Sequence, residues 1–141
     1  MSQEARSRLL AHTADIGLEV RAASRQLLFT AAARGLTRML FGVSPATASL
    51  RREVVLAAGD PAELLVAWLN EVLVFCETAH AVPAEFLIHE LVGCRLVASI
   101  GGEPFDPARH TVERTAKAVT YHQLVVEERD SGWYARVYID L

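Results

Sequence analysis

The hydrophobic pattern changes its period near residue 84, and this change constrains the fold more than any other feature of the sequence. Before it, two segments of the 141-residue chain carry apolar residues at helical spacing. After it come four short apolar runs separated by turn signals, which is typical of strands. Separate helical and strand patterns indicate the α+β class. We therefore expect two helices packed on one face of a largely antiparallel sheet.

The second helical segment has the clearest start signal. Asp60 is a good N-cap, Pro61 suits the first helical position, and Glu63 can close a capping box. A broad apolar face follows over residues 64–75, and we expect the helix to end within residues 78–84, which include Pro83. The first helix is expected to begin after Ser24, a residue type that caps helices, and to stop before a loop at residues 42–49.

The strand pattern predicts both the sheet and its turns. Early strands are expected at residues 9–11, 16–22 and 51–57, with Gly17 permitting a bend or bulge. Later strands are expected at residues 86–91, 94–100, 116–128 and 133–141. Gly93, the "GGEPFDP" loop and "RDSG" separate them, and "VVEERDSGWYARV" predicts an antiparallel hairpin.

Composition limits the class of protein. A chain of 141 residues with 52% hydrophobic content can form one domain, residues 1–141, with a substantial core. The net charge of −3 gives no overall basic field, so we expect contact with RNA only through a partner. No apolar run reaches the roughly 20 residues of a membrane span, and no signal peptide is evident, so a cytoplasmic protein that does not contact membranes is expected.

Reactive motifs are scarce. Cys76 and Cys94 form no CxxC motif and are expected as buried free thiols. No glycine-rich phosphate loop, GxSxG or HExxH pattern occurs. The sequence therefore does not indicate an enzyme.

The last strand-like run places two acidic groups side by side. Alternation puts Tyr134, Arg136, Tyr138 and Asp140 on one partly exposed face, opposite the apolar residues between Trp133 and Leu141. The Asp140 side chain and the Leu141 terminal carboxylate would then lie within a few ångströms and repel. A hard divalent cation would relieve this, since Ca²⁺ binds oxygen ligands in flexible geometry. The alternative is an exposed aspartate at a frayed chain end.

Four other polar positions allow either a structural or a functional role. In "HTADIG", Asp15 can point away from the core as a ligand or form an Asx-turn, whereas His12 is expected to hydrogen-bond neighbouring backbone. Glu71 borders the apolar face of the second helix and is either a solvated edge residue or a member of a site. Lys117 shares a strand face with Tyr121 and is either a solvated charge or a contact for a phosphate or an acidic partner.

Taken together, five stretches resemble the archease family. They are "HTADIG", "LLVAWLNEVLVF", "GEPFDPARH", "KAVTYH" and the terminal "DL", and their order and spacing cover about residues 12–141. The resemblance implies a compact α+β core of the strand–helix–strand–strand type that carries an insertion.

The resemblance also implies a site and a role. Archeases are similar to one another in binding a divalent cation, often Ca²⁺ although Mn²⁺ or Mg²⁺ is possible, through carboxylates that match Asp15, Asp140 and the Leu141 terminus. Glu71 matches the family's acidic residue in the second helix, and Lys117 matches the lysine of its "KA(V/I)TY" motif, a contact for the partner. That partner is a guanylylating RNA ligase of tRNA splicing or RNA repair, whose guanylylation and multiple turnover the family promotes without being a catalyst.

One departure and two alternatives stay open. Ala11 stands where relatives usually carry an acidic residue, so a group that supports the site is expected to be missing. An archease-type chain could instead be a chaperone or modulator of another RNA-modifying enzyme, such as a tRNA methyltransferase. A hydrolase built on Asp15 and Asp140 is disfavoured because no activated nucleophile accompanies them. The identity of the metal and the oligomeric state are left open.

Overall fold

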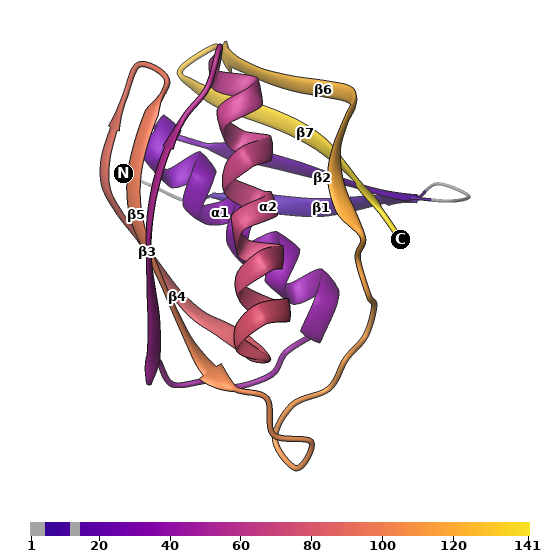
Figure 1. Ribbon diagram of the computed structural model, residues 1–141. Helices are drawn as coiled ribbons and strands as arrows, with labels where there is room; N and C mark the ends of the chain where they lie inside the picture. Colours follow the sequence, from indigo (N-terminus) through magenta and orange to yellow (C-terminus); the bar gives the residue numbers. More distant parts are fainter. Residues whose placement is uncertain (1–4, 12–14) are drawn as a thin grey trace.

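The computed structural model describes residues 5–11 and 15–141, which form two helices and seven strands (Figure 1). The predicted α+β class is confirmed. In chain order the elements are β1 (Arg6–Ala11), β2 (Asp15–Ala22), α1 (Arg25–Phe41), β3 (Leu50–Ala57), α2 (Pro61–Ala79), β4 (Ala81–Val92), β5 (Arg95–Pro104), β6 (Ala118–Arg129) and β7 (Gly132–Asp140).

The strands form two antiparallel sheets rather than one. Their strand orders are β1-β2-β7-β6 and β3-β5-β4. Both helices contact both sheets, so the core lies between the inner faces of the sheets and the helices (Figure 1). The outer face of the four-stranded sheet is therefore left uncovered by helices. In the described part of the chain, no helix combines the length and apolar character needed to cross a membrane.

Both helix starts follow the capping signals of the sequence. The Ser24 hydroxyl accepts a hydrogen bond from the Leu27 amide at 3.2 Å, and the Asp60 carboxylate accepts one from the Glu63 amide at 2.8 Å. On α2, the side chain of Trp68 is fully buried, and its indole N–H donates to the Phe29 carbonyl of α1 at 3.0 Å. The apolar face of α2 thus holds the two helices together.

The predicted end of the second helix within residues 78–84 is confirmed: α2 ends at Ala79, and His80 is a left-handed C-cap whose N–H donates to the Cys76 carbonyl. The following strand begins earlier than predicted, because residues 81–84 already belong to β4. Pro83 fits this strand because β4 lies at the edge of its sheet and shifts register beside Pro83. The predicted "GGEPFDP" loop is also shorter than expected, because β5 continues to Pro104. Within this part of β5, Gly102 leaves room for the Phe75 ring, since a Cβ on it would come within 2.6 Å of that ring.

The outer face of β7 is less exposed than its alternation suggests. Tyr134 and Tyr138 are only 3% and 5% exposed. β7 is a central strand, so long side chains of its neighbours cover these rings. The Arg129 and Arg21 guanidinium groups lie 3.7 and 4.7 Å from the centroid of the Tyr134 ring. Tyr134 thus lies between two arginines, whereas the Tyr138 ring contacts the His122 ring, with centroids 5.5 Å apart.

Candidate cation site at the end of the β2–β7 ladder

Two of the predicted site residues face each other directly. Asp15 begins β2, Asp140 ends β7, and the unbroken antiparallel register makes them cross-strand partners. Directly opposite residues have Cβ atoms about 4.5–5.5 Å apart and point to the same face. Both residues are half-exposed. Two like charges in this arrangement are unfavourable unless something of opposite charge joins them, and we call these two residues the acidic pair.

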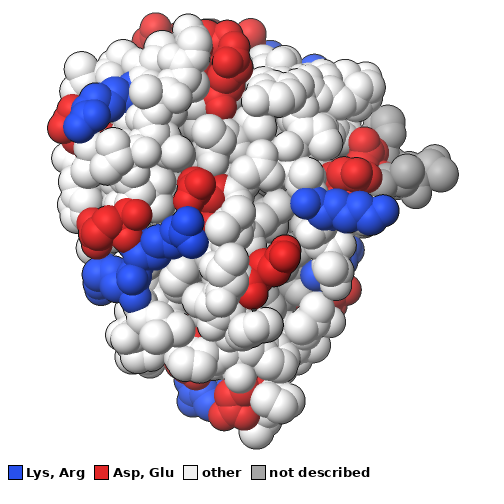
Figure 2. Space-filling model, viewed as in Figure 1, with Lys and Arg blue, Asp and Glu red and all other residues white. Residues whose placement is uncertain are grey.

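A basic residue from a third segment lies beside the acidic pair. The backbone N–H of Lys117 donates to the Asp140 carbonyl at 2.8 Å, and the next residue, Ala118, is the β6 partner of Asp140. Lys117 is exposed, as is Leu141, which follows Asp140. In Figure 2, acidic and basic side chains adjoin at the right-hand side of the molecule, near the end of β7. Segments distant in sequence thus converge at one end of the sheet.

Sequence reasoning missed the residue that holds this third segment in place. The Asn70 side chain on α2 accepts from the Val119 amide at 3.0 Å and donates to the Val119 carbonyl at 3.2 Å. β6 is an edge strand, and Asn70 satisfies the two backbone groups that Val119 turns away from β7. The signal was present in the sequence: one amide in the middle of a broad apolar helix face.

Three further predicted residues lie elsewhere or outside the structure. Glu71 forms an ion pair with Arg52 of β3, with Nη2 and Oε1 3.3 Å apart. Tyr121 is 64% exposed because the strand alternation ends after Thr120, where β6 loses its register with β7. His12 lies outside the described residues.

The chemistry of the acidic pair suits a hard cation, but its ligand number is low. Carboxylate oxygens are the ligands that Ca²⁺, Mn²⁺ and Mg²⁺ prefer, and Ca²⁺ takes about 6–8 of them. Within residues 5–11 and 15–141, no group of three or more His, Cys, Asp or Glu side chains is close enough to hold a metal ion. A cation at the acidic pair would need further oxygens from the Leu141 carboxylate, from water or from a partner.

A second carboxylate on the same face of β2 is neutralised within the chain. Glu19 accepts a hydrogen bond from the Tyr134 hydroxyl at 2.6 Å and pairs with the Arg8 guanidinium at 2.5 Å. Two hydrogen bonds hold the pKa of Glu19 below its usual value. The larger effect comes from the Tyr134 hydroxyl and the smaller from the Arg8 guanidinium. The pKa of Tyr134 is raised, first by burial and then by this bond. Glu19 is therefore a structural group.

A serine, a histidine and a glutamate meet on the three-stranded sheet without forming a nucleophilic site. Ser99 Oγ lies 2.7 Å from His89 Nε2 and 2.8 Å from both Glu53 carboxylate oxygens. The serine proton is donated to the carboxylate, so the histidine cannot act as its base. The Cys76 thiol is also unreactive, because burial raises its pKa to about 12.

The "GEPFDPARH" stretch has a structural role in this fold. Glu103 accepts hydrogen bonds from the Thr47 amide at 2.7 Å and from Arg109 Nε at 2.9 Å. His110, whose side chain is buried, lies 3.0 Å from the Pro45 carbonyl and 3.1 Å from Glu103. The hydrogen bond from the Thr47 amide lowers the pKa of Glu103 most, and the bond from Arg109 lowers it further. These contacts attach the segment after β5 to the loop between α1 and β3.

The fold and the acidic pair define an α+β protein whose distinctive feature is a carboxylate pair at the end of a central ladder. The family model of the archease protein family (MTH1598/TM1083) matches residues 8–141, and the chain belongs to this family. It is 32% identical over 146 residues to the protein archease of Methanosarcina mazei, with 99% of each chain covered. It is 33% identical over 133 residues to that of Methanopyrus kandleri, covering 92% of this chain and 95% of the relative.

A solved structure has the same fold. The solution structure of Methanobacterium thermoautotrophicum protein 1598 superimposes with a TM-score of 0.79 at 26% identity, covering 96% of this chain and 98% of that one. The archease-like α+β fold expected from the sequence is confirmed.

Proposed function

We propose that this protein is a non-catalytic, cation-binding accessory protein that promotes the guanylylation and multiple turnover of an RNA ligase in tRNA splicing or RNA repair. Membership of the archease family supports this proposal. The observation that carries it is the direct cross-strand pairing of Asp15 with Asp140, beside Lys117. Like charges directly opposite each other destabilise a ladder, and carboxylate oxygens are the ligands that hard divalent cations prefer.

The residues of this end have separate roles in the proposal. Asp15, Asp140 and the Leu141 carboxylate hold Ca²⁺, or Mn²⁺ or Mg²⁺, and leave coordination positions open to water or to groups of the ligase. The bound cation would offset negative charge on the phosphoryl groups that the ligase transfers. Lys117, exposed next to Asp140, contacts the ligase, and Asn70 positions the Lys117 segment.

The test is stimulation of ligase guanylylation by the whole chain, with labelled GTP and a guanylylating RNA ligase. Asp15→Asn and Asp140→Asn each remove one charge with little change of shape and should abolish stimulation. Glu90→Gln is the matched control, because Glu90 lies on the other sheet and pairs with Arg95 at 3.5 Å. Stimulation that survives both aspartate substitutions contradicts the proposal.

A second candidate is modulation of another RNA-modifying enzyme, such as a tRNA methyltransferase, through the irregular part of β6. The exposed Tyr121 ring next to the register shift favours a protein contact there. This role needs no cation, so residues added after Leu141 would leave it intact. The same extension should impair stimulation of the ligase, because it removes the terminal carboxylate.

A further inference from the structure

The edge strand β3 offers a regular, open row of backbone groups. It lies at one side of the three-stranded sheet, and its only partner in that sheet is β5 (Figure 1). The register with β5 runs from Leu50 to Ala57 without a bulge. A strand at the edge of a sheet presents unpaired N–H and C=O groups to which a further strand can bond. The free side of β3 is therefore a template for one more strand.

The ladder with β5 determines which backbone groups of β3 are free. The N–H of Ala58 donates to the Cys94 carbonyl at 3.0 Å, which places a hydrogen-bonded pair just beyond the end of β3. Such pairs alternate along an antiparallel ladder, so the even-numbered residues of β3 bond β5 and the odd-numbered residues turn away from it. The residues whose N–H and C=O groups point to the free side are all exposed, and they are Arg51, Glu53, Val55 and Ala57.

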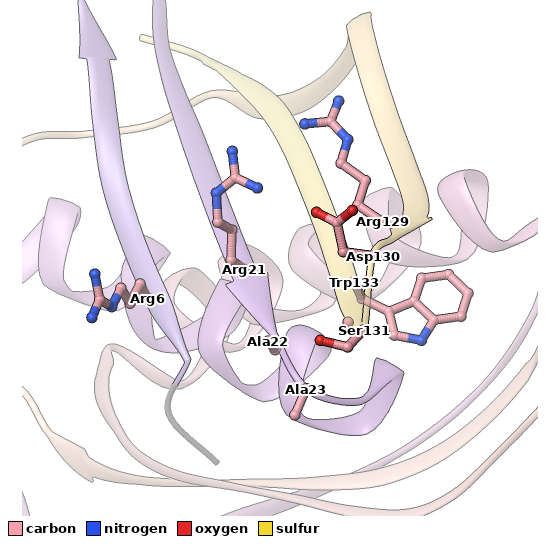
Figure 3. A pocket seen from close by; sticks show the side chains of 9 residues that line it. Arg6, Arg21, Ala22, Ala23, Arg129, Asp130, Ser131 and Trp133 are labelled. Carbon is pink, nitrogen blue, oxygen red and sulfur yellow. The ribbon is translucent and has the colours of Figure 1, made fainter. Parts of the chain in front are cut away.

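The other edge strands are protected against such pairing. β4 contains Pro83 and shifts register twice. At β6, the Asn70 side chain bonds the outward groups of Val119, and the register is lost soon afterwards. β1 is shorter and carries Arg6 and Arg8 but no acidic residue, so a second copy of it would add like charge (Figure 3). β3 has none of these features.

The charges of β3 do not protect its free side, because they are held by the chain itself. Arg51 pairs with Glu85 of β4 at 2.6 Å, and Glu53 accepts a hydrogen bond from the Ser99 hydroxyl of β5 at 2.8 Å. Both partners lie on strands on the far side of β3 from its free edge. The next outward residue, Val55, is apolar and 62% exposed. A neighbouring strand would therefore meet neutralised charges and an apolar side chain.

The strand is complementary to a second copy of itself in one register. Because only odd-numbered residues have free groups, they must bond odd-numbered residues of the second copy, and the two-fold axis then passes through one residue position. An axis at Arg52 or at Glu53 would place like charges directly opposite each other. An axis at Val55 would leave the free groups of Arg51 without partners. An axis at Val54 avoids both faults.

We propose that β3 pairs with β3 of a second copy of the chain, antiparallel and centred on Val54, so that the two three-stranded sheets become one continuous sheet. In this register Glu53 lies opposite Val55 of the second copy, and Arg51 lies opposite Ala57 of the second copy. All the free groups of the strand are then bonded. The acidic pair belongs to the four-stranded sheet, so each copy retains its own candidate cation site.

The first experiment is sedimentation velocity on the whole chain at concentrations up to the millimolar range, where the unsubstituted chain should form a dimer. Val55→Pro removes an N–H that bonds nothing in the single chain, and proline is tolerated on edge strands. This variant should raise the dissociation constant of the dimer by about ten-fold or more. Val55→Thr keeps the N–H and is the matched control, with a change of less than about two-fold. Urea unfolding checks that both variants fold.

The second experiment tests the register by cross-linking. With the axis at Val54, the two Val55 residues are diagonal neighbours, whereas the two Arg51 residues are six positions apart along the ladder, or about 20 Å. A short bis-maleimide should therefore join two copies of Val55→Cys but not two copies of Arg51→Cys. The unsubstituted chain, with Cys76 and Cys94, gives the background.

Three results would overturn the proposal: an unsubstituted chain that stays monomeric, a dimer that Val55→Pro leaves intact, and cross-linking of Arg51→Cys in preference to Val55→Cys. A monomeric chain in which Val55→Pro reduces stimulation of the ligase would assign the free side of β3 to the ligase instead of a second copy. The proposal is independent of the cation site, so calorimetric titration of Val55→Pro with Ca²⁺ should match that of the unsubstituted chain.

Discussion

Glu19 and Asp15 are two carboxylates on the same face of the same strand, four residues apart, and their surroundings are opposite. Glu19 receives the Tyr134 hydroxyl and the Arg8 guanidinium, and its cross-strand partner is Arg136. The cross-strand partner of Asp15 is another carboxylate, Asp140. A carboxylate that accepts a tyrosine hydroxyl and an arginine is part of the fold. Two carboxylates that face each other repel across the ladder, and this makes the acidic pair a candidate cation site.

The outer face of the four-stranded sheet shows a related contrast along its length. At one end, Arg6 and Arg21 are cross-strand partners; in the middle, Glu19 and Arg8 pair; at the other end, Asp15 and Asp140 are cross-strand partners.

The largest effect is expected from removing the balanced carboxylate. Glu19→Ala leaves the buried Tyr134 hydroxyl without its acceptor and should reduce the free energy of unfolding by about 2 kcal/mol. The exposed Arg8 side chain adds little to this loss. Urea unfolding of the whole chain measures the change. A loss as large in Asp15→Ala would remove the distinction between the two carboxylates.

The pH dependence of stability should carry the signature of Glu19. Because the Tyr134 and Arg8 bonds lower its pKa in the folded state, the unfolded chain binds more protons in the acid range. The stabilisation is complete above the usual pKa of about 4.3 and is lost as the pH falls through the lowered folded pKa. Glu19→Gln should flatten this part of the profile, measured by urea midpoints between about pH 3 and 6. An unchanged profile would contradict this assignment.

A smaller effect of opposite sign is expected at the acidic pair. Without divalent cations, Asp140→Asn removes the repulsion across the ladder and should stabilise the chain by about 0.2–1 kcal/mol. With CaCl₂ added, the unsubstituted chain should become more stable than Asp140→Asn, because the cation stabilises only the chain with both carboxylates. Thermal unfolding with chelator and with Ca²⁺ provides the comparison, and destabilisation under both conditions would count against a cation site.

The smallest effect on stability is expected at Lys117. Its side chain is exposed, and its structural contact is made by the backbone, so Lys117→Ala should change the free energy of unfolding by less than about 0.5 kcal/mol. Stimulation of the ligase should nevertheless fall, because a contact with the partner is removed. The paired measurement is urea unfolding and the guanylylation assay on the same sample; full stimulation by the variant would exclude Lys117 from the interface.

Local sequence signals predicted the elements well because their causes are local. The caps at Ser24 and Asp60 and the hairpin around Asp130 follow from residues close in sequence. The division into two sheets and the position of Pro83 in β4 depend on which strands become neighbours, and period-2 alternation carries no such information. The burial of Tyr134 has the same origin, since its cover comes from β2 and β6.

The candidate site was predictable in part. The stretches around Asp15, Lys117 and Asp140 were singled out from the sequence, and the register brings these three residues together. The helical pattern leaves Glu71 as either a solvated edge residue or a member of a site, and the resemblance favours the site. In the structure Arg52, 19 positions away in sequence, forms an ion pair with its carboxylate.

The most direct test of the acidic pair is a calorimetric titration with Ca²⁺ of three matched chains: the unsubstituted protein, Asp140→Asn and Glu19→Gln. We expect saturable binding by the unsubstituted protein and by Glu19→Gln, and none by Asp140→Asn. Equal binding by all three chains, or loss of binding only in Glu19→Gln, would contradict it.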